Sequence, residues 1–137
     1  MNIILDTNVL VTAMKSNKGA SYKLLTHIDS PSFQLHISTP LVFEYESILK
    51  REIERNRHAD MDAMVDYLCL IATAHQIFYL WRPVLHDIKD DHVLELAVKA
   101  QATIVTWNVK DFKIAKSKFG LDVMTPKALL KQKGLLT

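Results

Sequence analysis

The sequence has almost no cysteine, since Cys69 is the only one among 137 residues. A single cysteine excludes an internal disulfide and any metal cage of several thiolates, and it favours a reducing cytoplasm. No apolar run approaches the ~18 residues that a membrane-spanning helix needs. The first residues include no basic segment followed by a long apolar core, so we expect no secretory signal.

The chain also lacks a strong charge of either sign. It carries 17 Lys and Arg against 15 Asp and Glu, a formal net charge of +2, which excludes a dense basic coat for nucleic acid. Any contact with nucleic acid therefore depends on local basic patches. Linkers, low-complexity segments and internal repeats are not found either. With 49% apolar and 23% charged residues, we expect one globular domain that spans residues 1–137.

Apolar periodicity predicts that short strands alternate with helices along the chain. The predicted strands are Ile3–Leu5, Phe33–Ile37, Gln76–Trp81, Ala102–Thr106 and Leu121–Met124. The predicted helices are Asn8–Met14, Ala20–Ile28, Pro40–Arg55, Asp60–His75, Asp91–Gln101, Lys113–Phe119 and Pro126–Gly134, with Thr39 and Thr125 as caps. This alternation is typical of an α/β fold with a mainly parallel sheet and helices on both faces.

The stretch Ile3–Leu10 places three apolar residues directly before Asp6, Thr7 and Asn8. A short apolar run that ends in polar residues is typical of a buried strand. Ligands of open α/β sheets bind outside the carboxyl ends of the strands. We therefore expect Asp6 at the edge where such sheets carry out chemistry. The alternative is that Asp6 only caps the following helix.

Three further acids occupy comparable places. Glu44 lies on the flank of the apolar face of its predicted helix, where a carboxylate is costly unless it is paired or binds a metal. Asp90 directly precedes the predicted helix Asp91–Gln101 and lies on its apolar face, whereas Asp91 points away from that face. The alternative is that Asp90 only caps this helix and that Asp91 only interacts favourably with the helix dipole. Asp111 follows the fourth predicted strand.

Clustered carboxylates repel one another, and one pKa rises sharply unless a cation lies between them. Oxygen ligands without cysteine favour hard ions such as Mg²⁺ or Mn²⁺. Such ions assist the hydrolysis of phosphodiesters. If they meet in space, Asp6, Glu44, Asp90 and Asp111 therefore favour metal-dependent phosphodiester hydrolysis.

Two alternatives rest on other features. His86 and His92 flank several acids, but a zinc hydrolase has a tighter His pair on one helix face. Surface or capping histidines are the simpler interpretation. A phosphoacceptor receiver domain needs paired acids early in the chain, whereas Asp6 stands alone.

Four segments carry the most specific motifs of the chain. They are IILDTNVL at residues 3–10, FQLHISTPLVFEYESILKRE at 33–52, KDDHVLELAVKAQATIVTWNVKDF at 89–112 and VMTPKALL at 123–130. In this order they resemble the PIN-domain family, and within it the toxin ribonucleases of prokaryotic type II toxin–antitoxin systems. The resemblance covers nearly the whole chain. It implies a three-layer α/β/α fold and an endoribonuclease that depends on Mg²⁺ or Mn²⁺.

The resemblance also assigns catalytic and metal-binding roles to individual residues. The family's first aspartate corresponds to Asp6, with Thr7 and Asn8 as supports. Its helical glutamate corresponds to Glu44, and its third acid corresponds to Asp90. This last assignment agrees with the argument from helical faces.

The last acid is where this chain departs from the family pattern. Many members have aspartate where this chain has Asn108, so Asp111 either replaces that ligand or acts from a second layer. Asn108 accepts hydrogen bonds through its carbonyl but brings no charge. A weaker second metal site is the resulting hypothesis. Thr106, with Thr7, is expected to place the scissile phosphate or a ligand water.

Basic residues in and near these segments are candidates for contact with the RNA backbone. They are Arg51, Arg55, Lys110, Lys113 and Lys116. The resemblance further implies a homodimer and a small antitoxin protein that blocks the site. The alternative from another class is a PIN-like module that binds RNA or protein without cutting. The retained acids argue against that module, and Asn108 argues mildly for it.

Overall fold

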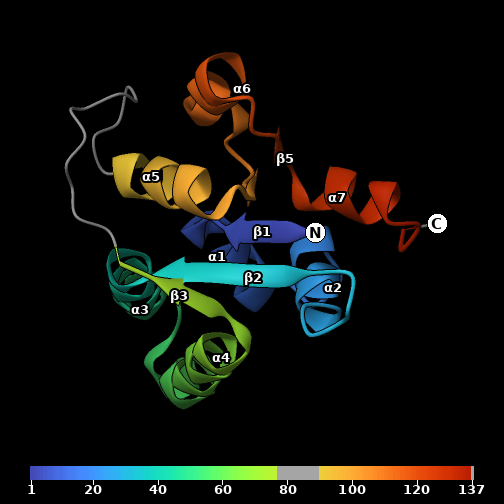
Figure 1. Ribbon diagram of the computed structural model, residues 1–137. Coiled ribbons are helices and arrows are strands. Elements are labelled where there is room, and N and C mark those ends of the chain that lie inside the picture. Colours follow the sequence, from blue (N-terminus) through green and yellow to red (C-terminus); the bar gives the residue numbers. More distant parts are fainter. Residues whose placement is uncertain (77–89, 137) are drawn as a thin grey trace.

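A computed structural model describes residues 1–76 and 90–136 of the chain (Figure 1). The described strands form one parallel sheet in the order β3-β2-β1-β4-β5. The strands are β1 (Asn2–Leu5), β2 (Gln34–Ser38), β3 (Thr73–His75), β4 (Thr103–Val105) and β5 (Val123–Met124). The predicted parallel sheet is confirmed. Apart from Gln76, the strand predicted at 76–81 lies outside the described residues, and so does His86.

Helices cover both faces of this sheet (Figure 1). The α-helices are α1 (Thr7–Lys15), α2 (Ala20–Thr26), α3 (Thr39–Glu52), α4 (His58–Ile71), α5 (Asp91–Ala100), α6 (Lys113–Phe119) and α7 (Pro126–Gln132), and the short 3-10 helices are η1 (Arg55–Arg57) and η3 (Val109–Phe112). Helix α5 packs on β1, β2 and β4, whereas α1 packs against α2 and α3, and α3 packs against α4. The predicted α/β fold class is confirmed. Among the described helices, none is long and apolar enough to cross a membrane.

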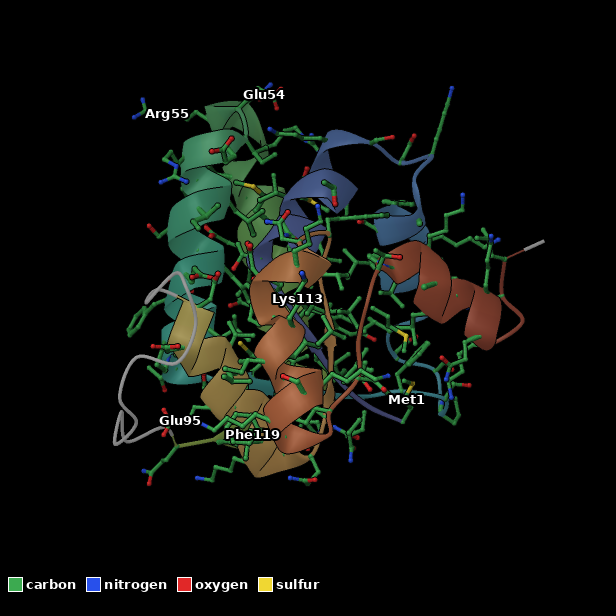
Figure 2. The ribbon with its side chains drawn as sticks, turned by 90° about the horizontal axis from the view of Figure 1, so that it is seen from above. Met1, Glu54, Arg55, Glu95, Lys113 and Phe119 are labelled. Atoms are coloured by element: carbon green, nitrogen blue, oxygen red, sulfur yellow. The ribbon has the colours of Figure 1, made fainter. Side chains whose placement is uncertain are left out.

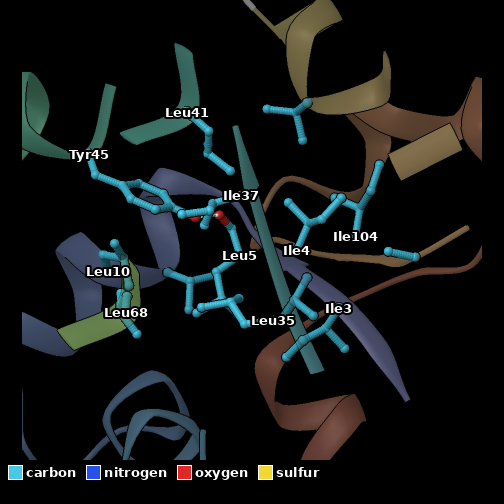
Figure 3. Close-up of a cluster of buried hydrophobic side chains, with 14 of the residues drawn as sticks. Ile3, Ile4, Leu5, Leu10, Leu35, Ile37, Leu41, Tyr45, Leu68 and Ile104 are labelled. Atoms are coloured by element: carbon cyan, nitrogen blue, oxygen red, sulfur yellow. Dashed lines mark hydrogen bonds between the residues drawn. The ribbon is translucent and has the colours of Figure 1, made fainter. Parts of the chain in front are cut away.

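Strand β1 is the centre of the core, and its Ile3, Ile4 and Leu5 are fully buried. These three residues are apolar and lie on both faces of the sheet, as expected for a strand covered by helices on each side. Figure 3 shows Leu35 of β2 and Ile104 of β4 in the same apolar cluster. Burial of each side chain of this size contributes roughly 1.5–3 kcal/mol. The end of β1 is therefore firmly fixed, and so is the backbone of Asp6, which follows it.

The chain leaves helix α4 earlier than the sequence predicts. The pattern predicts a helix to His75, but α4 ends at Ile71 and the chain then forms β3. Strand β3 pairs with β2, and Nε2 of His75 lies 2.8 Å from Nδ1 of His36 on β2. Pairing with a residue far away in the sequence has overridden the local helix preference.

The cap of α3 lies one position earlier than predicted. The hydroxyl of Ser38, not that of Thr39, accepts the backbone N–H of Leu41 at 3.3 Å. Serine and threonine are both preferred caps, so their order in the sequence does not decide between them. The cap predicted for α7 is confirmed, because Thr125 accepts the N–H of Ala128 at 3.1 Å.

The connections of β1 make the centre of the sheet a switch point. The chain passes from β1 through α1 and α2 to β2 on one side, while β4 lies on the other side of β1. Ligands of open α/β sheets bind at such points, outside the carboxyl ends of the strands. Asp6 follows β1 and Thr106 follows β4, so both residues lie at this position.

The phenol of Tyr45 links helix α3 to the last residue of β1. Its hydroxyl donates to the carbonyl oxygen of Leu5 at 2.5 Å, and the residue is 1% exposed. Replacement by phenylalanine keeps the ring but removes this donor from a buried carbonyl. We expect Tyr45→Phe to lower the free energy of unfolding by about 1–3 kcal/mol, as measured by urea denaturation.

Tyr67→Phe is the matched control. The hydroxyl of Tyr67 donates to Oδ2 of Asp29 at 2.8 Å in an exposed position, where water replaces a lost partner. This variant should therefore leave the free energy of unfolding almost unchanged. Equal losses in the two variants, or no loss in Tyr45→Phe, would contradict the importance of the buried bond.

Candidate active site

The side chain of Asp6 lies at the junction of β1 and α1. Its backbone N–H donates to the carbonyl of Val105 at 2.9 Å, which extends the pairing of β1 with β4. Its Oδ1 accepts the N–H of Thr7 at 2.9 Å, so Asp6 is also the N-cap of α1. Asp6 therefore does cap α1, but that hydrogen bond uses only one of the two carboxylate oxygens. The residue is 7% exposed.

The other oxygen of Asp6, Oδ2, is held from β4 and from α1. Thr106 donates its hydroxyl to Oδ2 at 2.8 Å, and Nδ2 of Asn8 donates at 3.3 Å. Asn8 Nδ2 also lies 3.2 Å from the Thr106 hydroxyl. A carboxylate has about four lone-pair positions, so these donors and the cap orient Asp6 and, as far as residues 1–76 and 90–136 are concerned, leave one position on Oδ1. Thr106 is fully buried, and its hydroxyl orients Asp6 through this hydrogen bond.

Glu44 of helix α3 contacts two residues near Asp6, namely Thr7 and His92. Thr7 donates its hydroxyl to Oε2 of Glu44, and Nε2 of His92 lies 3.3 Å from Oε1. The side chain of Glu44 is 20% exposed, and that of His92 is 11% exposed. The N–H of Thr7 binds Asp6 while its hydroxyl binds Glu44. One residue therefore sets the spacing between two carboxylates.

The residues around Asp6 line a cavity of about 440 Å³. The lining residues are Asp6, Thr7, Asn8, Val11, Thr12, Glu44, Ile48, Arg51, Glu52, Asp90, Asn108 and Asp111. The cavity thus brings together all four acids that the sequence analysis selected. Asp91 is not among its described lining residues, in agreement with the argument from helical faces.

The predicted RNA-contacting residues are spread over the surface. Arg51 lines the cavity, whereas Lys113 and Lys116 border a smaller cavity of about 300 Å³ at α6. Figure 2 shows Arg55 and Lys113 well apart, on different elements. Lys110 is exposed in η3. Contact of these side chains with RNA stays a prediction.

Burial raises the pKa of Asp6 above its ordinary value of 3.8, and the charge of Glu44 adds to the rise. The hydroxyl of Thr106, the N–H of Thr7 and the charge of His92 act in the opposite direction on this pKa. The net rise means that ionised Asp6 is held at a cost in free energy. A cation in the cavity would remove that cost.

The donor set of the cavity suits a hydrated hard cation. Among residues 1–76 and 90–136, no three His, Cys, Asp or Glu side chains lie close enough together to hold one metal ion. Mg²⁺ does not need such a cluster, because it keeps several waters and uses one or two carboxylates together with substrate phosphates. The open position on Asp6 and its neighbour Glu44 fit this mode, and Asp90 and Asp111 would act through water.

Two lining or bordering residues have roles that the sequence analysis missed. His92 is expected at the surface or as a cap, but its ring is nearly buried against Glu44. Helical spacing was the available signal, because His92 precedes the fully buried Leu96 by four residues. Glu52 is exposed and also lines the cavity, where its carboxylate lies 3.5 Å from Lys15 Nζ. That position depends on the packing of α1 against α3, which local spacing does not encode.

The fold and the site define a class of protein, namely an α/β domain with a carboxylate-lined cavity at the switch point of a parallel sheet. The family model described as a PIN domain matches residues 2–110. The chain therefore belongs to the PIN-domain family, and the predicted resemblance is confirmed. The match includes Asp6, Glu44 and Asp90, while Asp111 directly follows it.

Solved structures share this fold at low sequence identity. VapBC2 from Rickettsia felis, bound to a DNA fragment from their promoter, is 16% identical, with coverage of 91% of this chain and 98% of that chain and a TM-score of 0.62. VapBC-1 from nontypeable Haemophilus influenzae is 16% identical over 93% and 99% of the two chains, with a TM-score of 0.61. FitAB bound to an IR36 DNA fragment is 15% identical over 90% and 94%, with a TM-score of 0.63. Among curated protein sequences, none matches this chain.

The raised pKa of Asp6 predicts how stability depends on pH. The folded protein holds the Asp6 proton more tightly than the unfolded chain, whose carboxyl has the ordinary pKa of 3.8. The contribution of Asp6 to stability is thus intact below pH 3.8 and falls as the pH rises through the raised folded pKa. The measured quantity is the free energy of unfolding of the metal-free native protein minus that of Asp6→Asn. We expect this difference to decrease from pH 3.8 to the raised pKa of the folded protein and to level off above it.

Urea denaturation of both proteins across the acidic and neutral range measures this difference. Subtracting the variant removes most of the contribution of the other titrating groups. A difference that stays constant, or that increases with pH, would show that the folded protein does not raise the pKa of Asp6.

Proposed function

We propose that this protein is an endoribonuclease that depends on Mg²⁺ or Mn²⁺ and is the toxin component of a toxin–antitoxin pair. The observation that carries the proposal is the single cavity lined by Asp6, Glu44, Asp90 and Asp111 at the switch point of the sheet. PIN domains are generally nucleases that depend on divalent metals. An acidic cavity whose donors are oxygens suits such hard ions.

The acids divide into ligands and supports. Asp6 and Glu44 would hold the ion directly, Asp90 would hold it through a bound water, and Asp111 and Asn108 would complete or orient the site. When bound, the ion would neutralise charge on the phosphate and lower the pKa of the attacking water. The protein's own part is to hold the carboxylates in place before the substrate arrives.

The hydrogen bonds around the carboxylates supply this preorganisation. Thr106 and Asn8 fix one oxygen of Asp6, and Thr7 fixes the position of Asp6 relative to Glu44. Fixed dipoles of this kind need not reorganise during the reaction. Arg51 at the cavity would attract the RNA phosphates despite the surrounding acids.

The proposal extends to two protein partners, a small antitoxin and a second copy of this chain. Support for the antitoxin comes from the neighbours in fold, which are VapBC and FitAB antitoxin–toxin complexes. The homodimer rests on the resemblance of the sequence to toxin ribonucleases.

Cleavage of a mixed RNA panel tests the proposal. We expect the native protein to cut RNA with Mn²⁺ or Mg²⁺ and to stop when the metal is chelated. Asp6→Asn should lower the rate by more than about 100-fold, because changes that only touch the partners of a metal ligand already cost 10- to 100-fold. Product formation on denaturing gels measures the rate.

Asp66→Asn is the matched control, since Asp66 is an exposed carboxylate of α4 and is not among the described residues that line the cavity. It should keep the native rate. Equal activity of native protein and Asp6→Asn would contradict the proposal. RNA binding without cutting by the native protein would favour the non-catalytic binding module.

Asn108 allows a test of the weaker metal site. One added negative charge beside a divalent ion is worth roughly 1–2 kcal/mol in water. We therefore expect Asn108→Asp to tighten Mn²⁺ binding by about tenfold, as measured by titration calorimetry. Asn17→Asp adds the same charge at an exposed position away from the cavity and should leave the affinity unchanged. Equal affinities of Asn108→Asp and the native protein would show that residue 108 is not near a bound ion.

A further inference from the structure

Trp107 is a residue that the proposed cleavage does not explain. It directly follows Thr106, and it is 38% exposed. Exposure alone means little, because single exposed apolar side chains are common on protein surfaces. The feature that sets Trp107 apart is the way in which its ring is fixed.

The indole N–H of Trp107 is bonded to two hydroxyls from different helices. It donates to Oγ of Ser21 on α2 at 2.8 Å and to Oγ1 of Thr12 on α1 at 3.1 Å. These two hydroxyls lie 2.6 Å from each other. The N–H is the only polar group of the ring. It faces the protein, so the exposed part of the ring consists of carbon.

The ring also lies beside the cavity. The backbone N–H of Trp107 donates to Oδ1 of Asn8 at 3.2 Å, and its indole binds Thr12. Asn8, Thr12 and the next residue, Asn108, all line the cavity. The same Asn8 donates to the carboxylate of Asp6. Trp107 is therefore fixed to the residues that position the acids.

We propose that Trp107 is a stacking platform for an unpaired base of the nucleotide next to the phosphate that the cavity binds. This inference rests on the proposed function. It names Trp107 as the residue that would make the protein prefer single-stranded RNA to duplex RNA. Aromatic side chains stack on any base, whatever its sequence. A ring that is already fixed loses little conformational entropy when a base stacks on it. Bases within a duplex are already stacked, so they are not available to the ring.

The first test uses the fluorescence of Trp107 itself. The sequence has two tryptophans, Trp81 and Trp107, so Trp81→Phe leaves Trp107 as the only one. Adding Asp6→Asn prevents cleavage during the titration. Oligoadenosine RNA should quench the fluorescence of this double variant, whereas the same RNA annealed to its complement should not.

The second test separates stacking from charge. An oligomer of abasic ribose phosphates has the backbone charge of oligoadenosine but no bases. In the Asp6→Asn protein, it should bind roughly 5- to 150-fold more weakly than oligoadenosine, the range that stacking of one base supplies. Adding Trp107→Ala should abolish this difference, whereas Tyr67→Ala, which removes a ring that is 41% exposed on α4, should preserve it.

The outcomes distinguish the platform from the nuclease. Equal binding of the two oligomers by protein with native Trp107 overturns the platform, whether or not Trp107→Ala folds. Quenching and base-dependent binding, with no metal-dependent cutting by the native protein, support the platform and overturn the proposed function. Cutting that Trp107→Ala leaves unchanged in both kcat and KM overturns the platform alone.

Discussion

The site depends on a carboxylate that is kept almost out of water. Asp6 is 7% exposed, and its burial and the charge of Glu44 both oppose ionisation. Donors from Thr7, Asn8 and Thr106 offset part of this cost. These donors come from the start of α1 and the end of β4, so the network holds only if β1 and β4 are paired. The core around β1 supplies that pairing, and the chemistry of the site is therefore coupled to the stability of the fold.

The fold was predictable where local signals agree with the final contacts. Helix α6 has the predicted bounds because Gly120 ends it in the left-handed region, with φ at 67°. The end of α4 was not predictable, since residues 72–76 include no glycine or proline that would stop a helix there. Strand β3 forms there because β2 offers it partners, including His36. Long-range pairing of this kind is not encoded in a local window of sequence.

The acids of the site were predictable because each follows a strand or flanks an apolar helical face. The sequence therefore indicated Asp6, Glu44, Asp90 and Asp111, which the structure places around one cavity. The contacts between elements were less accessible to sequence reasoning. The contact of His92 with Glu44 joins α5 to α3, and the fixing of Trp107 joins the end of β4 to α1 and α2.

The hydrogen bond between Asp6 and Thr106 spans 100 positions of the chain. Ribosomes add about 5–20 residues per second, so Thr106 is synthesised roughly 5–20 s after Asp6. During that time the carboxylate has its neighbours on α1 but not the hydroxyl that orients its second oxygen. A nascent chain, or one truncated before β4, thus carries the first acid without a formed site. For a protein proposed to cut RNA, this order of synthesis delays activity until most of the chain has left the ribosome that makes it.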